Sequence, residues 1–270
     1  MVREQLHDRY AVEREIGRGG AARVFLARDP EGNPVALKVL HPELLVSVTA
    51  DRFLREIGLI SRLEHPNIGR LLDSGERDWL VYYVMPYVEG PSLKEYLKKF
   101  RRVDIEDTVR IARDLLAALA HAHQQKIIHR DVKPDNILLS PGGVVLVDFG
   151  IARAIEVSGS DRLTRSGIAV GTSTYMSPEQ VAALQNIDHR TDLYSVGCVL
   201  FECLAGRPPY FHPNESVVLV MQQTATLPDV TSLRPDTPPG LARMVARALS
   251  KRPEDRWASA EEMAAELDKS

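Results

Sequence analysis

The apolar residues of this chain change their spacing near Gly90, and this change limits the fold more than any other feature. Before that point, β-strand patterns occur at 10–16, 23–28, 35–40, 68–74 and 79–85, with one helical pattern at about 51–63. After it, helical spacing occurs at about 92–99, 104–125, 190–205, 214–222, 238–249 and 259–268. The sequence therefore predicts an α+β fold, with a small β-rich part containing one main helix followed by a larger α-helical part.

Composition restricts the classes of partner. The chain has 270 residues, an apolar fraction of 44% and a formal net charge of −3. Nucleic acid is not expected as a partner, because binding a phosphate backbone requires clustered Lys and Arg. The two cysteines, Cys198 and Cys203, are too few for a disulfide framework or a paired-cysteine zinc site. We expect both to be small buried residues in a reducing cytosol.

The sequence has no pattern typical of a membrane protein. Its first residues lack the apolar segment of a signal peptide. The longest apolar stretch, from Tyr194 to Gly206, contains Glu202 and is too short to span a bilayer. We expect a cytoplasmic segment without membrane contact, which could be the intracellular domain of a longer, membrane-anchored protein.

A glycine-rich segment begins at Gly17, continues through Gly19 and has Ala22 where a further glycine would be usual. It lies between two strand patterns, whereas a dinucleotide-binding turn requires a strand followed by a helix. The segment therefore predicts a hairpin flap whose backbone can approach a phosphate closely. An ordinary glycine hairpin without a ligand remains an alternative for this segment taken alone.

Lys38 lies in an otherwise apolar strand pattern. An unpaired buried ammonium group is costly, so this lysine needs an acidic partner. Glu56, on the helical pattern that follows, is the candidate. The alternative is an exposed strand lysine with an unrelated surface glutamate.

Two strings combine charged residues with apolar strand patterns. They are Ile-His-Arg-Asp-Val-Lys-Pro-Asp-Asn-Ile-Leu-Leu at 128–139 and Val-Leu-Val-Asp-Phe-Gly at 145–150. With Lys38 and Glu56 before them, they resemble the catalytic and metal-binding loops of eukaryotic-like protein kinases. The resemblance extends from about Tyr10 to Leu267, and the string Ser-Pro-Glu-Gln at 177–180 favours the bacterial serine/threonine branch.

This resemblance implies the bilobal protein kinase fold across 1–270 and transfer of the ATP γ-phosphoryl group to Ser or Thr hydroxyls of proteins. The N-lobe is expected at about 10–86, the hinge at about 86–90 and the C-lobe at about 91–268. Protein substrates are the implied partners, and relatives of this type also suggest a homodimer formed through the N-lobe.

The resemblance also assigns roles in the phosphoryl transfer, where positioning and charge neutralisation matter most. Lys38 is expected to hold the α- and β-phosphates, with Glu56 fixing its position. Asp131 is expected to orient the substrate hydroxyl and accept its proton. Lys133 is expected to stabilise the transferred group.

The same resemblance places a divalent cation at Asn136 and Asp148, with Mg²⁺ as the expected ion and Mn²⁺ as a substitute. The preference for Ser or Thr over Tyr rests on Lys133 and on Thr172.

The nucleotide site is implied at the junction of the two parts. Its expected residues are Ile16, Gly17, Gly19, Val24, Ala36, Lys38, Met85, Pro86, Val88 and Leu138. Met85 corresponds to the gatekeeper, and the backbone of Pro86 and Val88 is expected to bind adenine. The family usually has an acidic residue in place of Pro86, but the group needed is a carbonyl, which proline keeps.

Two further expectations concern architecture and control. Asp192 is expected to brace the catalytic loop, and Arg256 to pair with Glu179 as a structural ion pair. Because Arg130 precedes Asp131, the resemblance suggests activation by phosphorylation of the loop after Gly150. Thr164 is the first expected autophosphorylation site and Ser166 the second, with Arg130 and Arg153 as the phosphate partners.

Three alternatives have different functions. A pseudokinase acting as an ATP-binding scaffold is expected to lack one or more of Lys38, Asp131, Asn136 and Asp148, and all four are present. A small-molecule kinase generally lacks the long segment from Asp148 to Glu179 found here. A nucleotide sensor could bind ATP without transferring a phosphoryl group.

Overall fold

The computed structural model describes residues 2–20, 22–41, 50–77, 80–149 and 173–269. These residues form two compact units. The first comes from Met1–Glu64 and Gly69–Glu89, and the second from His65–Ile68, Gly90–Phe149 and Gly171–Ser270, with the gaps just given. The predicted α+β composition is confirmed, with strands concentrated in the first unit and helices in the second.

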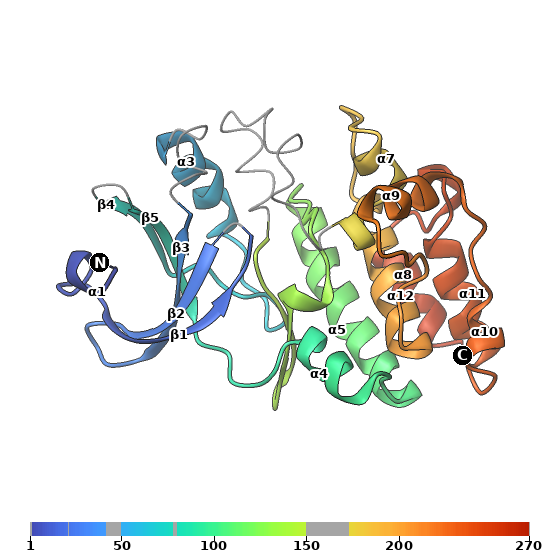
Figure 1. Cartoon of the computed structure of the whole chain (residues 1–270), viewed down its shortest axis with the longest axis horizontal. Coiled ribbons are helices and arrows are strands. Elements are labelled where there is room, and N and C mark those ends of the chain that lie inside the picture. Colours follow the sequence, from blue (N-terminus) through green and yellow to red (C-terminus); the bar gives the residue numbers. More distant parts are fainter. Residues whose placement is uncertain (1, 21, 42–49, 78–79, 150–172, 270) are drawn as a thin grey trace. The chain divides into compact units, whose positions relative to one another are not determined.

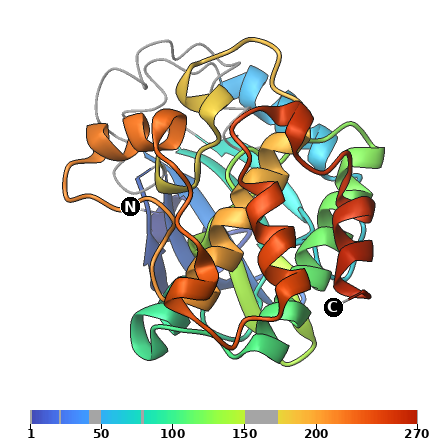
Figure 2. The same ribbon diagram turned by 90° about the vertical axis from the view of Figure 1, so that its right-hand side faces the viewer.

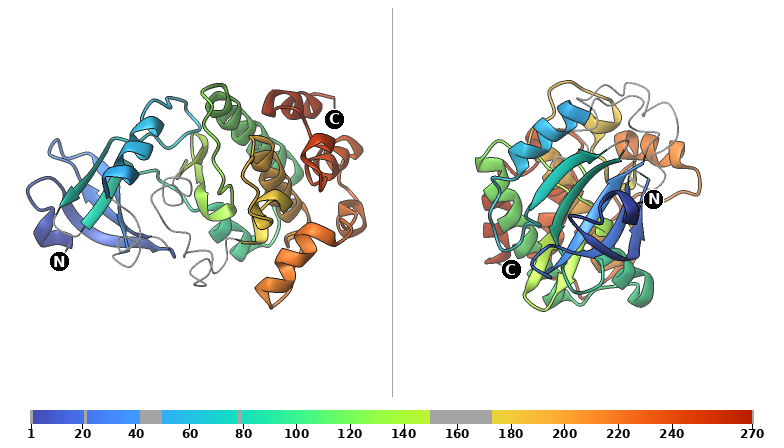
Figure 3. Two further views of the ribbon diagram at one scale, coloured as in Figure 1. Left: turned by 90° about the horizontal axis from the view of Figure 1, so that it is seen from above. Right: turned by 90° about the vertical axis from the view of Figure 1, so that its left-hand side faces the viewer.

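The first unit contains one antiparallel sheet with the strand order β1-β2-β3-β5-β4 (Figures 1 and 3). Its strands are β1 (Ala11–Arg18), β2 (Ala22–Arg28), β3 (Pro34–Leu40), β4 (Asp73–Arg77) and β5 (Leu80–Pro86). The glycine-rich segment therefore lies in the β1–β2 hairpin, as the sequence predicted, and Gly19 donates its N–H to the carbonyl of Ala22 at 2.9 Å.

One predicted strand is misplaced. The sequence predicted a strand at 68–74, but β4 begins only at Asp73. Ile68 instead forms a bridge with Leu146 in the second unit, and Leu71 is buried outside any strand. Buried apolar residues at such spacing resemble a strand in the sequence although their backbone pairing lies elsewhere.

The two faces of the sheet have different roles. One face is a continuous apolar cluster with the short helix α1 (Val2–Gln5) beside it, formed by Leu6, Tyr10, Phe25, Ala27, Val35, Leu37, Val39, Leu80, Tyr82 and Val84. Because neighbouring residues of a strand point to opposite faces, the even-numbered residues of β2 and β3 belong to the other face. Helix α3 (Ala50–Ile60) packs on that side, where Phe53 contacts Tyr83 with a ring separation of 6.5 Å.

The second unit is mainly helical (Figure 2). Its longer helices are α4 (Leu93–Phe100), α5 (Ile105–Gln124), α8 (Arg190–Ala205), α9 (Glu215–Thr224), α11 (Pro239–Ala248) and α12 (Ala260–Leu267). Shorter elements are α7 (Pro178–Val181), α10 (Val230–Leu233) and the hairpin of β6 (Ile137–Ser140) and β7 (Gly143–Leu146). The hairpin and the two short helices lie within or between segments for which the sequence predicted no separate element.

Helix α8 is the centre of this unit. It is mostly apolar, contacts α5, α10 and α11, and is buried along nearly its whole length. Cys198 and Cys203 lie on it as free, fully buried thiols, and burial raises the pKa of both. Among the described residues, no helix combines the length and apolar character needed to cross a bilayer.

Two glycines provide a test of the backbone. Gly90 has a φ of +133°, and an added Cβ would lie 1.9 Å from the carbonyl oxygen of Leu139. We expect Gly90→Ala to lower the free energy of unfolding by about 1–3 kcal/mol, because both the backbone and this close approach exclude a side chain. Urea denaturation measures the change.

The matched control is Gly58 on the exposed side of α3, where a Cβ would have no neighbour within 4 Å. Gly58→Ala should raise the free energy of unfolding by about 0.5–1 kcal/mol, since alanine loses less backbone entropy in a helix. A similar loss in both variants would contradict this explanation of Gly90.

Candidate active site

Five of the expected nucleotide-site residues share one face of the sheet in the first unit. Gly17 on β1 pairs with Val24 on β2, and Val24 pairs in turn with Lys38 on β3. Ala36 lies two residues before Lys38 and pairs with Met85 on β5. Since directly paired residues and residues two apart point to the same side, this face carries all five, opposite the apolar cluster.

Helix α3 lies on the same face as Lys38. Tyr83 pairs with Lys38 in the sheet, and the Lys38 ammonium lies 5.9 Å from the centre of its ring. The same ring contacts Phe53, and Glu56 follows Phe53 by nearly one helical turn. Lys38 and Glu56 are both half-buried, so the fold directs them to a common region. Their ion pair stays a prediction.

Packing among the described residues does not require glycine at positions 17 and 19. A Cβ on Gly17 would contact Val24 at 3.7 Å, and one on Gly19 would contact the Ala22 carbonyl at 3.8 Å. Both are ordinary van der Waals distances. The close approach of a phosphate to this backbone stays a prediction.

The remaining expected residues of this site lie on different elements. Ile16 is half-buried on β1, Pro86 is exposed at the end of β5 and Val88 is half-buried just after it. Leu138 lies on β6 in the second unit, where it pairs with Val145.

The second unit gathers three catalytic-loop residues. The Lys133 ammonium lies 2.7 Å from Oδ2 of Asp131. Asn136, on the short 3-10 helix Pro134–Asn136, donates its side-chain amide to the same oxygen at 3.1 Å and to the Asp131 carbonyl at 2.8 Å. The Asp131 side chain remains 20% exposed, so its carboxylate is held in place yet accessible.

His129 connects this loop to the strand that precedes Asp148. Its Nδ1 accepts the backbone N–H of Asp131 at 3.1 Å, so Nε2 must carry the proton. That Nε2 donates to the carbonyl of Val147 at 2.9 Å. The imidazole is fully buried and contacts Phe149 edge-on, so it fixes the separation of the two loops.

Asp192 on α8 braces the catalytic loop, as the sequence predicted. Its two carboxylate oxygens accept the backbone N–H groups of His129 at 2.9 Å and Arg130 at 2.8 Å. His123 contacts one of these oxygens at 2.8 Å. Burial by itself would raise the pKa of Asp192, but His123 and the backbone donors outweigh it and lower the pKa below its ordinary value.

The two expected metal ligands suit a hard cation. Because the amide nitrogen of Asn136 donates to Asp131, its oxygen is the atom available as a ligand. Asp148 is half-buried and has a φ of +67°, a conformation often found at functional sites. Within the described ranges, no three His, Cys, Asp or Glu side chains gather in a metal-binding arrangement. A two-ligand site still fits Mg²⁺, which keeps waters and substrate phosphates as its other ligands.

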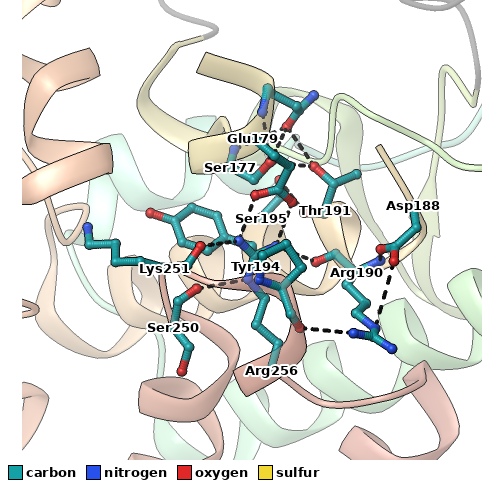
Figure 4. Close-up of polar contacts among 12 residues, drawn as sticks. Ser177, Glu179, Asp188, Arg190, Thr191, Tyr194, Ser195, Ser250, Lys251 and Arg256 are labelled. Atoms are coloured by element: carbon teal, nitrogen blue, oxygen red, sulfur yellow. Dashed lines mark hydrogen bonds and ion pairs between the residues drawn. The ribbon is translucent and has the colours of Figure 1, made fainter. Parts of the chain in front are cut away.

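Glu179 and Arg256 form the predicted ion pair, with distances of 2.6 and 2.7 Å (Figure 4). The guanidinium also donates to the backbone carbonyls of Arg190, Ser250 and Lys251. These five hydrogen bonds use all five N–H groups of the guanidinium. The pair is almost fully buried and lies against the ring of Tyr194. It therefore attaches α7 to the core of the second unit.

Four expected residues lie outside the described part of the chain. These are the phosphate partner Arg153, the two expected phosphorylation sites Thr164 and Ser166, and Thr172. Their roles stay predictions.

Comparison with known proteins identifies the family. The sequence model of the family described as "Protein kinase domain" matches residues 10–267. The chain belongs to the protein kinase domain family. Serine/threonine-protein kinase pkn3 of Myxococcus xanthus is 40% identical over 96% of the chain and 49% of its own length.

Two further relatives cover as much of the chain. PrkC of Bacillus subtilis is 35% identical over 99% of the chain and 41% of its own length. PknB of Mycolicibacterium smegmatis is 39% identical over 98% of the chain and 43% of its own length. Both are named serine/threonine-protein kinases. The chain thus spans less than half the length of these curated relatives.

The sequence did not indicate how two residues of this kinase domain contribute. His129 lies in the quoted catalytic string, but its bridging contacts depend on how two loops meet in space. Gln180 follows Glu179, and its side chain donates to the carbonyl of Arg130 at 2.8 Å. A sequence signal for Gln180 exists only as a helix-capping pattern, Ser-x-x-Gln, which says nothing about the catalytic loop.

The buried ion pair can be tested by stability. Arg256→Met removes five donors and leaves the carboxylate of Glu179 buried without its cation. We expect the free energy of unfolding to fall by about 3–5 kcal/mol. Urea denaturation of the purified domain measures it.

Arg113, which forms an exposed pair with Asp268, is the matched control. Arg113→Met should change stability by less than about 1 kcal/mol, because solvent screens an exposed pair. Equal effects of the two substitutions would show that burial does not govern the Arg256 pair.

Proposed function

We propose that this chain transfers the γ-phosphoryl group of ATP to Ser or Thr hydroxyls of proteins. One observation carries the proposal: the accessible carboxylate of Asp131 is held by Lys133 and Asn136 through a single oxygen, Oδ2. That arrangement leaves Oδ1 to face a substrate hydroxyl and accept its proton.

The neighbours of Asp131 have complementary roles in this proposal. Lys133 lies close enough to Asp131 to contact a transferred phosphoryl group as it approaches the hydroxyl, and its positive charge stabilises the charge that develops there. Asn136 holds Asp131 with its amide nitrogen and offers its amide oxygen to a cation. The three side chains therefore place a base, a cation and a metal ligand within one short loop.

Nucleotide binding is assigned to both units. In the first, Lys38 is proposed to hold the α- and β-phosphates, while Ala36, Val24 and Met85 of the same sheet face contact the adenine. Asp148 and Asn136 are proposed to hold Mg²⁺. When bound, this ion neutralises phosphate charge and aligns the oxygens for transfer.

The hydroxyl class rests on the relatives. The curated relatives are named serine/threonine-protein kinases, which supports Ser and Thr as acceptors. A homodimer through the first unit and a cytoplasmic location remain part of the proposal. No observed feature favours the alternative of a pseudokinase scaffold.

The general base can be tested directly. Asp131→Asn keeps the shape of the side chain but removes the proton acceptor. We expect the rate of phosphoryl transfer from Mg-ATP to a generic basic protein to fall roughly 10²–10⁴-fold. Incorporation of labelled phosphate under single-turnover conditions measures this rate.

A matched control makes the same chemical change at an exposed position. Asp236, whose side chain is 68% exposed, pairs with Arg234 in a loop that has no proposed catalytic role. Asp236→Asn should leave the transfer rate within about twofold of the wild type, as for most surface substitutions. Full activity of Asp131→Asn would falsify the role of Asp131.

We also propose that the kinase phosphorylates its own loop, at Thr164 first and Ser166 second. An added phosphate carries about −1.5 to −2 charge and can order a segment by pairing with arginine, here Arg130 and Arg153. Mass spectrometry after incubation with Mg-ATP should find phosphate on Thr164, and none in Asp131→Asn. An unmodified loop in an active enzyme would contradict this proposal.

A further inference from the structure

Arg130, the residue before the proposed base, has an unusual backbone that is held from two sides. Its φ is +66°, in a region that non-glycine residues seldom occupy. Its N–H donates to Oδ1 of Asp192 at 2.8 Å. Its carbonyl accepts a hydrogen bond from Nε2 of Gln180, also at 2.8 Å. Since this carbonyl belongs to the peptide that joins Arg130 to Asp131, Gln180 acts on the backbone that carries the base.

The orientation of the Gln180 amide follows from its neighbours. Its oxygen accepts the backbone N–H of Ser177 at 3.1 Å and the hydroxyl of Thr191 at 3.0 Å. On the other side, its hydrogen-bond partner among the described residues is the carbonyl of Arg130, which must receive a donor. Exchanging nitrogen and oxygen would place like groups against each other at both ends, so the network permits one orientation.

The chain contains two similar helix caps that lack this contact. Ser92 and Glu95 form the same reciprocal capping box at α4, with the Glu95 carboxylate accepting the backbone N–H of Ser92. At α12, Ser259 accepts the N–H of Glu262. A carboxylate is therefore sufficient for a cap of this kind. The amide of Gln180 adds a donor that capping does not need.

The support behind Gln180 is rigid. Ser177 and Thr191 are fully buried, and their hydroxyl oxygens lie 2.6 Å apart. The preceding residue, Glu179, is held by two hydrogen bonds from Arg256, and Figure 4 shows this pair near Ser177 and Thr191. The donor on Gln180 is thus held by the core of the second unit rather than by a free surface side chain.

We propose that Gln180 is a positioning residue for Asp131. Its donor fixes the carbonyl of Arg130, Asp192 fixes the N–H of Arg130, and together they set the direction in which the Asp131 side chain points. The proposal rests on the function proposed above for Asp131. It separates two roles within one side chain, an oxygen that caps α7 and a nitrogen that orients the base.

The decisive substitution is Gln180→Glu. It keeps the capping oxygen and the size of the side chain but places a carboxylate oxygen against the Arg130 carbonyl. We expect kcat to fall roughly 10- to 100-fold, because small displacements of a reacting group have effects of this size. KM for ATP should stay close to the wild-type value, and any fall in the melting temperature should be matched by a capping variant that keeps kcat.

Two controls separate positioning from folding. Ser259→Ala removes the cap of α12, a helix with no proposed role in positioning the loop, so it should lower the melting temperature and leave kcat within about twofold. Glu95→Gln makes the reverse exchange in the capping box of α4 and should change neither kcat nor stability appreciably. If Ser259→Ala lowers kcat as much as Gln180→Glu does, the loss of kcat follows loss of stability and the proposal is wrong.

A pH series gives a second readout. A protonated carboxyl group regains an O–H donor for the Arg130 carbonyl, so the ratio of wild-type to Gln180→Glu activity should shrink as pH falls. Arg130, Asp131, Asp192 and the Glu179–Arg256 pair lie near this position in both proteins, so comparison with the wild type at each pH removes most of their own effect on the rate. A ratio that stays constant between pH 5 and about pH 8 would count against the hydrogen bond as the cause.

Asp131→Asn distinguishes failure of this inference from failure of the proposed function. If Asp131→Asn is inactive and Gln180→Glu turns over within about twofold of the wild type, only the role of Gln180 is overturned. If Asp131→Asn keeps full activity, both the proposed role of Asp131 and the inference about Gln180 are wrong.

Discussion

The buried carboxylate of Asp192 is the interaction on which the catalytic loop depends. It lies on α8, the most completely buried helix of the second unit, and accepts two consecutive backbone N–H groups of the loop. A carboxylate in such a place is stable only when its oxygens are hydrogen-bonded. The two hydrogen bonds that satisfy this charge are also the ones that hold the loop. The loop therefore cannot move away from α8 without leaving a buried charge unsatisfied.

The contacts of the loop form a series around Asp131. His129 ties its N–H to the Val147 segment, Asp192 holds the residue before it, and Lys133 and Asn136 hold its side chain. Positive φ angles occur at Arg130 and Asp148, next to or within the proposed site. Such conformations persist only where the surroundings determine them, and at Arg130 the hydrogen bonds with Asp192 and Gln180 do so. The buried helical core thus holds a few polar atoms of the loop in fixed positions.

The two faces of the sheet in the first unit carry different kinds of side chain. One face forms the apolar cluster, and the other carries Lys38 among small and apolar side chains beside α3. This division follows from the alternation of side chains along strands, because a strand that is apolar on both faces can pack on one and receive a flat, apolar ligand on the other. Gly17, where the chain leaves room for a Cβ, lies on the same face as Lys38.

The sequence by itself determined the family and the order of β-rich and helical parts, and it supplied the candidate site residues, whose roles stay predictions. It could do so because catalytic chemistry requires particular residue types at fixed spacing, as in the strings around Asp131 and Asp148, and because burial imposes a regular apolar period on helices such as α5 and α8. It misplaced β4, since the apolar residues before Asp73 are buried without pairing as a strand. Only the tertiary structure decided that Gln180 reaches the carbonyl of Arg130 and that His129 joins two loops. Those contacts connect residues far apart in the chain, where hydrogen-bond geometry depends on packing and leaves no periodic pattern to read.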